Sequence, residues 1–295
     1  MHLVFLLTTY YYLLTMPFRY IDIHAHLNFA AFDVDREATV KRALEAGVAF
    51  ITVGTQQDTS HKAVEMAEAH ENGVFAIVGL HPVHTSKSYH DEKELGKGGQ
   101  EFTSRGETFD ISNYDELAKH PKTVGIGECG LDYYRLEPDS EHKQKEAFLG
   151  HIALANEVHK PLMLHVRNGS GRSAYREALE ILKREAKVGG DFHFFAGSWE
   201  EAKEVLDAGF HLSFTGVITF THDYDEVVRN APLDRILSET DSPYVTPAPY
   251  RGKRNEPLYV KEVVKAIARI RNEDEEKVRV EILKNAERLF KIKLA

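Results

Sequence analysis

Short apolar runs alternate with longer amphipathic stretches from residue 20 to the C-terminus. Continuous apolar runs of this length are typical of strands that are covered on both faces, whereas one-sided strands show strict alternation. We predict strands at 20–26, 49–55, 74–80, 123–128, 161–166, 191–195, 211–215 and 236–240.

The stretches between these runs carry apolar residues at helical spacing, as Val40, Ala43 and Leu44 do in one of them. Helices are predicted at 34–46, 140–159, 172–186, 257–271 and 273–290. Eight strands that alternate with helices favour an α/β fold of the (β/α)8 TIM barrel type over an open sheet. The C-terminal ends of the strands of such a barrel form the rim where active sites are built.

Two segments depart from this alternation. Residues 1–15 are apolar and aromatic, but they lack the positive start and cleavage site of a signal peptide and are short for a membrane span. We favour a mis-assigned start, with Met16 as the first residue, over an N-terminal membrane anchor. Residues 84–112 form a polar insertion after the third strand, either a lid at the rim or, slightly favoured, a tolerated surface insertion. The remainder, 16–295, is predicted to be a single domain.

Composition narrows the possible functions and locations. The formal net charge of −9 gives no general attraction for nucleic acid, so a phosphate-bearing substrate needs bound cations or a local basic cluster. The single cysteine, Cys129, excludes an internal disulfide and suits a reducing compartment. No other membrane segment is found in the sequence. We therefore expect a cytoplasmic protein, with no membrane association and no stable protein partner.

The first predicted strand ends in a His-x-His pair, His24 and His26. Side chains two apart on a strand share a face, so both imidazoles can bind one divalent cation. Further ligand-type residues lie at or near the ends of other predicted strands: Glu128, His165, His193 and Asp241. Each has an ordinary alternative, such as a core histidine or a turn-capping aspartate. One metal site at the rim accounts for all six together.

An ordered set of motifs surrounds these residues. They are Ile21-Asp-Ile-His-Ala-His-Leu27, Gly79-Leu-His-Pro82, Gly127-Glu-Cys-Gly-Leu-Asp-Tyr-Tyr134, Pro161-Leu-Met-Leu-His-Val-Arg167, His193-Phe-Phe-Ala-Gly197, Glu239-Thr-Asp-Ser-Pro243 and Asn285-Ala-Glu-Arg-Leu-Phe290. Each motif alone is weak, but the set resembles, in order, the TatD family of metal-dependent deoxyribonucleases within the amidohydrolase-like barrels. The resemblance spans residues 20–290.

The resemblance implies two divalent cations, with Mg, Mn and Zn as candidates. One would be held by His24, His26, Glu128 and Asp241, and the other by Glu128, His165 and His193. A bridging glutamate separates this chain from related barrels that carry a modified lysine at this position. Residues 168–173, Gly150 and the long insertion depart from the family pattern. These departures affect the expected substrate and leave the ligand set intact.

The activity implied is cleavage of DNA phosphodiester bonds, on single-stranded DNA or 3′ ends in the 3′ to 5′ direction. Glu128 and Asp241 are the predicted catalytic residues, with Asp241 receiving the proton of the attacking water. Candidate substrate contacts are His81, Arg167, Arg251, Lys253 and Arg254, although the basic loop is equally consistent with a solvated surface. Two alternatives stay open: a metal-dependent hydrolase of a small amide or ester, and a non-catalytic metal-binding barrel.

Overall fold

The structure is a computed structural model that describes residues 18–87, 89–90, 102–103, 105–134, 136 and 139–294. The prediction for residues 1–15 falls outside these ranges, and so do residues 88, 91–101 and 104 of the insertion at 84–112. Within the insertion, strand β4 (Tyr89–His90) pairs antiparallel with β5 (Phe102–Thr103). Within the described ranges, no helix has both the length and the apolar character needed to cross a bilayer.

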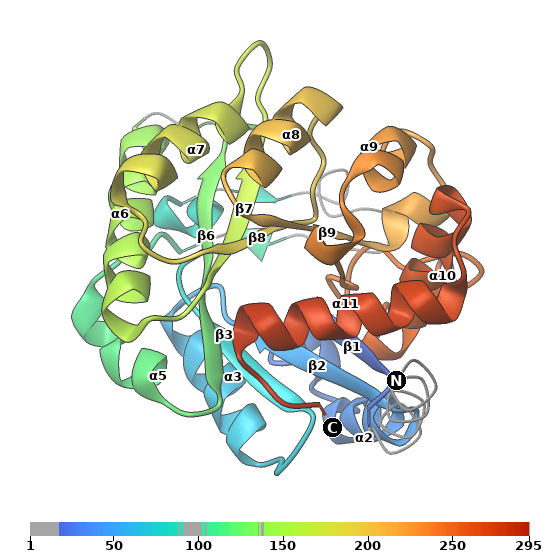
Figure 1. Cartoon of the computed structure of the whole chain (residues 1–295). Helices are drawn as coiled ribbons and strands as arrows, with labels where there is room; N and C mark the ends of the chain where they lie inside the picture. Colours follow the sequence, from blue (N-terminus) through green and yellow to red (C-terminus); the bar gives the residue numbers. More distant parts are fainter. Residues whose placement is uncertain are drawn as a thin grey trace, which may run out of the picture.

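Eight parallel strands form the wall of a barrel and alternate with helices, which confirms the predicted (β/α)8 fold (Figure 1). The strands, in the order in which they neighbour one another, are β1 (Tyr20–Ala25), β2 (Val48–Val53), β3 (Val74–Val78), β6 (Thr123–Asp132), β7 (Leu162–Arg167), β8 (Gly190–His193), β9 (His211–Phe214) and β10 (Ile236–Ser238). All eight overlap the predicted runs. The longest, β6, extends beyond its predicted end, so Glu128 lies within the strand rather than at its terminus.

The helices lie outside the strands (Figure 1). They are α2 (Arg36–Glu45), α3 (Gln57–Glu68), α5 (Asp115–Lys119), α6 (Ser140–Val158), α7 (Ala174–Glu185), α8 (Trp199–Asp207), α9 (Asp225–Asn230), α10 (Val260–Arg271) and α11 (Glu275–Phe290). The five predicted helices are present with slightly different ends. Helices α3, α5, α8 and α9 were not predicted. The buried face of α3 is built largely from small residues such as Ser60, Ala63 and Ala67, and the other three have nine residues or fewer.

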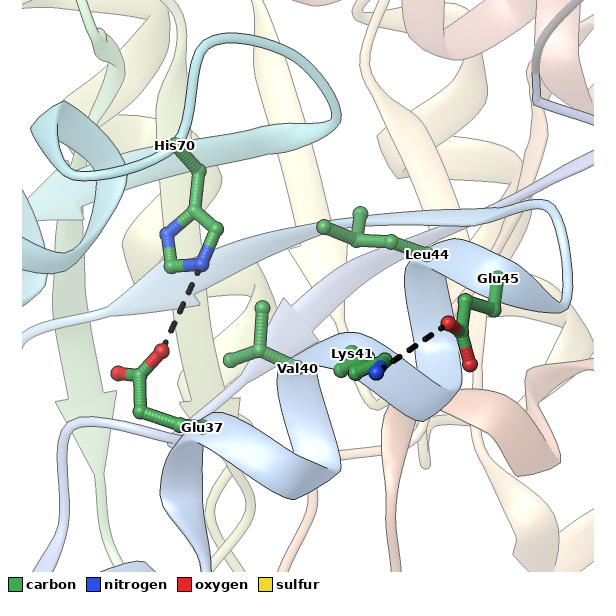
Figure 2. A pocket seen from close by; sticks show the side chains of 6 residues that line it. All are labelled: Glu37, Val40, Lys41, Leu44, Glu45 and His70. Carbon is green, nitrogen blue, oxygen red and sulfur yellow. Dashed lines mark ion pairs between the residues drawn. The ribbon is translucent and has the colours of Figure 1, made fainter.

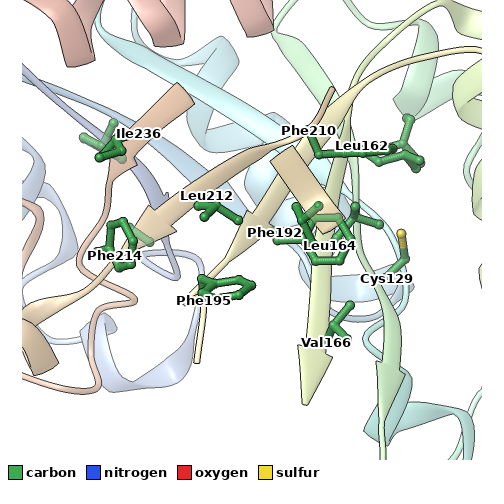
Figure 3. Close-up of a cluster of buried hydrophobic side chains, with 14 of the residues drawn as sticks. Cys129, Leu162, Leu164, Val166, Phe192, Phe195, Phe210, Leu212, Phe214 and Ile236 are labelled. Carbon is green, nitrogen blue, oxygen red and sulfur yellow. The ribbon is translucent and has the colours of Figure 1, made fainter. Parts of the chain in front are cut away.

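The buried apolar residues of the strands belong to two cores, with alternate residues of a strand in different cores. The larger fills the space between strands and helices, and Figure 3 shows part of it, with Leu164, Phe192 and Leu212 projecting from neighbouring strands. The smaller joins apolar residues of several strands to helix α11 and the C-terminal tail, among them Ile51, Met163, Leu237, Leu283, Phe290 and Ile292. Burial of these side chains is the main favourable contribution to folding.

Strands β1 and β10 close the barrel without a regular ladder. Asp22 accepts hydrogen bonds from the backbone N–H and the hydroxyl of Thr240, and the Ser238 hydroxyl donates to the carbonyl of Ile21. Beyond them, the N–H of Asp241 donates to the carbonyl of His24 at 2.8 Å. The closure therefore places Asp241 directly beside the His-x-His pair.

Register shifts in two strands change the direction of key side chains. The shift in β1 lies between Asp22 and Ala25, and the shift in β6 lies between Ile126 and Cys129. A β-bulge inserts residues into one strand and re-aims the side chains beside it. Gly127 sits in the second bulge with φ +150°, and a Cβ there would lie 2.4 Å from the Met163 carbonyl oxygen. A glycine is therefore required immediately before Glu128.

Gly150 departs from the family pattern, and its contact with the insertion explains why a residue without a side chain stands there. A Cβ at Gly150 would lie 2.6 Å from the ring of Phe109. Phe109 stacks on His151 with ring centroids 3.7 Å apart and on Tyr114 at 4.9 Å. The missing side chain makes room for the end of the insertion to pack on helix α6.

Candidate metal centre

Four side chains from three places in the chain form the first cluster. The Nε2 atoms of His24 and His26 are 3.2 Å apart. Oδ1 of Asp241 lies 3.8 Å from the first of these nitrogens and 3.3 Å from the second, and Oε2 of Glu128 lies 3.3 and 3.8 Å from them. Metal–ligand bonds of about 2.0–2.2 Å place tetrahedral ligand atoms about 3.3–3.6 Å apart. The spacing of this cluster fits one cation at its centre.

The other oxygen of Glu128 faces a second cluster. Oε1 lies 2.9 Å from Nδ1 of His165 and 2.8 Å from Nε2 of His193, and these two nitrogens are 3.1 Å apart. Three atoms this close, two imidazole nitrogens and a carboxylate oxygen, are a donor set suited to a divalent transition metal. Glu128 is thus positioned to bridge two cations.

The surroundings of Glu128 favour its charged form. Glu128 is 2 % exposed, and its Oε2 has no hydrogen-bond donor. Burial on its own raises the pKa of a carboxyl group, but the imidazoles of His81, His193 and His24 hold that of Glu128 well below its usual value. A buried anion with an unsatisfied oxygen is costly unless a cation compensates it. The residues present therefore fit a metal centre.

The surroundings of His165 favour the positively charged form of its imidazole. Its burial lowers the pKa, but hydrogen bonds to Asp132 and Glu128 outweigh this effect and raise it. The two ring nitrogens lie 2.9 Å from Oδ2 of Asp132 and 2.9 Å from Oε1 of Glu128. A cation at Nδ1 would take the place of the proton there.

His81 lies beside the second cluster in a different protonation state. Burial, followed by repulsion from His165, lowers the pKa of His81 to about 4, so the ring is neutral at pH 7. The N–H of Val83 donates to Nδ1 at 3.1 Å, which leaves the hydrogen on Nε2. That nitrogen lies 3.2 Å from Oε1 of Glu128. His81 therefore presents a hydrogen-bond donor to the site.

Asp132 was quoted in a motif but given no role from the sequence. It ends β6 and accepts a hydrogen bond from His165 Nε2, while its other oxygen accepts from the N–H of Tyr134. Metal-binding histidines commonly donate their second ring N–H to a carboxylate, which fixes the orientation of the ring. The sequence signal available for Asp132 was its position directly after Gly130-Leu131, on the strand next to the one that carries the candidate ligand His165.

We expect Asp132→Asn to weaken metal binding by roughly 10- to 100-fold, since the amide no longer orients and polarises His165 as the carboxylate does. Competition with a chromogenic chelator measures the affinity of each site. Asp207→Asn, on the exposed side of α8, is the matched control. Unchanged affinity in Asp132→Asn would show that Asp132 has no orienting role.

Glu239 was likewise quoted in a motif without a role. It is fully buried, accepts a hydrogen bond from the N–H of Phe194 at 2.7 Å, and lies 3.4 Å from Nδ1 of His193. Below it, the hydroxyl of Ser213 lies 2.9 Å from Glu239 and 2.5 Å from Asp191. A hydroxyl has one hydrogen, so it can donate to only one of these carboxyl groups. A protonated Asp191 that donates to Ser213 resolves the conflict.

Burial, followed by repulsion from Glu239, raises the pKa of Asp191 to about 8. Between about pH 4 and 8 the folded chain then retains a proton that the unfolded chain releases, so this group makes stability fall as the pH rises. We expect the free energy of unfolding to fall by about 1.4 kcal/mol more per pH unit in the parent than in Asp191→Asn across this window. Urea titrations of chelator-treated protein at pH 5 and pH 8 measure it. Equal slopes would contradict the assignment.

The four basic residues among the predicted substrate contacts all lie against aromatic rings, and one of them also has an acidic partner. Arg167 lies 3.6 Å above the ring of Tyr134, and Arg251 lies 4.0 Å above the ring of Phe220. Lys253 approaches Tyr250 at 5.7 Å. Arg254 lies 4.2 Å above the ring of Phe32, and it also forms two 2.8 Å hydrogen bonds with the Asp35 carboxylate and lowers the pKa of that group to about 2. Arg254 thus connects the loop after β10 to the start of α2.

A surface hollow lies far from this chemistry in the fold. Figure 2 shows it between α2 and His70, with ion pairs from His70 to Glu37 at 3.8 Å and from Lys41 to Glu45 at 3.7 Å. Among the described residues, none of the groups able to hold a metal ion includes a residue of this hollow. It belongs to the outer helical layer.

Comparison with known proteins agrees with this geometry. The family described as TatD related DNase matches residues 21–291. An uncharacterized metal-dependent hydrolase of Bacillus subtilis, YabD, is 39 % identical over 276 residues, which cover 92 % of this chain and 98 % of that protein. The 3'-5' ssDNA/RNA exonuclease TatD of Erwinia tasmaniensis is 32 % identical, with coverage of 92 % and 99 %.

Among solved structures, YJJV, a TatD homologue from Escherichia coli, superposes with a TM-score of 0.78 at 26 % identity, covering 94 % of this chain and all of that one (100 %). The family match extends over most of the chain, and the relatives are matched over nearly their whole length. The chain therefore belongs to the TatD-related DNase family and is a metal-dependent hydrolase.

Proposed function

We propose that this hydrolase is a nuclease that uses two divalent cations to remove nucleotides from the 3′ end of single-stranded DNA. One observation carries the proposal: the two oxygens of Glu128 face two separate clusters of nitrogen and oxygen atoms, at 2.8–3.8 Å. Two-metal sites of this kind clamp both the attacking and the leaving oxygen of a phosphate ester.

The six candidate ligands have distinct tasks in this proposal. His24, His26 and Asp241 would hold one cation, His165 and His193 the other, and Glu128 both. When bound, the cations would supply positive charge to the phosphate and lower the pKa of a water molecule.

Two side chains would handle protons and hydrogen bonds. Burial alone raises the pKa of Asp241, but the hydrogen bond with His26 and the nearby imidazole of His24 bring it below its usual value. The carboxylate is therefore ionised at neutral pH and able to accept the proton of the attacking water. The Nε2–H of His81 is positioned to donate to a phosphate oxygen.

Charge complementarity supports a phosphate-bearing substrate in spite of the acidic chain. The net charge is −9, yet cations at the rim would reverse the local field where the scissile phosphate binds. Arg167 ends β7 two residues beyond His165 and adds a fixed positive charge there. The activity named for the Erwinia relative, that of a 3'-5' ssDNA/RNA exonuclease, supports the direction and strand preference.

The test is cleavage of 5′-labelled single-stranded DNA by chelator-treated protein, to which magnesium, manganese or zinc is returned. We expect a ladder of products that shorten from the 3′ end, and a 3′-terminal phosphorothioate should block it. Parallel assays on RNA and on a panel of small esters, amides and phosphodiesters define the substrate class. If no metal restores cleavage of DNA while an ester or amide is hydrolysed, the nuclease proposal is wrong. If nothing is hydrolysed although metal binds, the chain is a binding protein.

A further inference from the structure

Exposed apolar side chains are concentrated at the catalytic end of the barrel. Five large apolar side chains are exposed among the described residues: Val34, Tyr134, Leu136, Leu149 and Phe220. All but Leu149, which lies on the outer helix α6, belong to loops that follow the C-terminal ends of β1, β6 or β9. Apolar surface that gathers on one face marks an interaction site more often than scattered apolar residues do.

Phe220 and Arg251 form an anchored pair on this rim. Phe220 is 46 % exposed, and the guanidinium of Arg251 lies 4.0 Å from the centroid of its ring. Arg251 also donates to the carbonyl of Thr246 at 2.9 Å, and the N–H of Ala248 donates to the hydroxyl of Thr219 at 2.8 Å. The first bond fixes Arg251 within the loop that begins at the candidate ligand Asp241, and the second joins this loop to the loop after β9. The pair is therefore held in place before any ligand binds.

Tyr134 and Arg167 form an equivalent pair at the ends of β6 and β7. Tyr134 is 48 % exposed, and the Arg167 guanidinium lies 3.6 Å from the centroid of its ring. Asp132, which orients His165, pairs with Arg167 in the β6–β7 register. Tyr134 and Arg167 thus each lie two residues beyond a residue of the metal centre, Asp132 or His165. This second pair lies on the side of β6 and β7, whereas the first lies on the side of β9 and β10.

Each pair joins a flat ring to a flat cation. A nucleobase stacks on aromatic side chains and on arginine guanidinium planes, and the arginine charge attracts the adjoining phosphate. A small ester or amide has no succession of flat rings and anions with which to use two such pairs. The chemistry of the pairs therefore matches a single strand whose bases are unstacked.

We propose that Phe220–Arg251 and Tyr134–Arg167 are two nucleotide subsites, one on each side of the metal centre, in which the base stacks on the aromatic–arginine pair. This proposal rests on the nuclease function proposed above. It assigns the recognition of single-stranded substrates to stacking, so recognition depends on the presence of bases and not on their sequence.

The test compares KM and kcat for two single-stranded oligonucleotides, one ordinary and one whose 3′-terminal nucleotides lack bases. For the parent, the abasic oligonucleotide should have a KM roughly 5- to 100-fold higher. Phe220→Ala should raise KM on the ordinary oligonucleotide within the same range, leave kcat within about twofold, and cause no further rise on the abasic one. Tyr134→Ala should behave in the same way.

Three variants complete the design. Phe220→Trp keeps a flat ring and should restore a low KM, whereas Phe220→Leu keeps apolar volume and should not. Leu149→Ala removes an exposed apolar side chain from the outer layer and should match the parent. If the parent cleaves DNA and the KM values of Phe220→Ala and Tyr134→Ala equal that of the parent, the subsite proposal is wrong and the nuclease function still stands. Failure of the parent to cleave DNA with any metal would instead overturn the function itself.

Discussion

Glu128→Ala should abolish metal-dependent hydrolysis, with a fall in kcat of about 1,000-fold or more. The reason is that Glu128 places one carboxylate oxygen in each cluster, Oε2 in the first and Oε1 in the second. Its loss removes a ligand from each cation and the negative charge that compensates them, and a few kcal/mol of lost transition-state stabilisation corresponds to this factor. Turnover at saturating metal and the metal content of the purified variant are the two measurements.

A second buried carboxylate provides the control for this variant. Glu201 is also buried at the rim, but its oxygens are bound by Ser173, Asn168 and the N–H of Ser198. Glu201→Ala therefore reports the effect of deleting a buried carboxylate without touching the clusters, and its turnover per folded molecule should stay close to that of the parent. A Glu128→Ala protein with normal metal content and turnover would contradict the bridging role.

The strand pattern and motif order were sufficient to predict the fold and the family, and both predictions are confirmed. The contacts that close the barrel could not be predicted from the same patterns. Closure depends on hydrogen bonds between Asp22 and Thr240, two residues 218 positions apart that carry no pattern linking them. Register shifts in β1 and β6 were also invisible, because hydrophobic periodicity assumes an unbroken strand.

The candidate site was predicted in part. Sequence reasoning named the six side chains that the structure brings together, because ligand-type residues at strand ends stand out against apolar strands. The surrounding carboxylates, Asp132 and Glu239, lie in the same motifs but act through hydrogen bonds to His165 and contact with His193. Such roles depend on which atoms meet across strands. Arg254 shows the converse, since a basic loop residue near the rim is engaged by Asp35 from another element.

Asp241→Asn should lower kcat by roughly 100- to 10,000-fold while most of the metal stays bound. The asparagine oxygen can still face His24 and His26, whereas the proton acceptor is lost. The lowered pKa of Asp241 also fixes the sign of the pH dependence: the parent stays active until the pH falls below the usual range of a carboxyl group, where protonation of Asp241 removes the acceptor. The measurements are kcat against pH and metal content, for parent and variant.

The exposed Asp234→Asn is the matched control, since it makes the same chemical change on the short turn before β10 and should leave both quantities unchanged. Two results would separate the roles of Asp241. Loss of metal in proportion to loss of kcat would mean that the carboxylate acts as a ligand alone. If the residual kcat of Asp241→Asn falls at low pH in the same way as that of the parent, another group causes this fall, because the variant has no carboxyl group at position 241 to protonate.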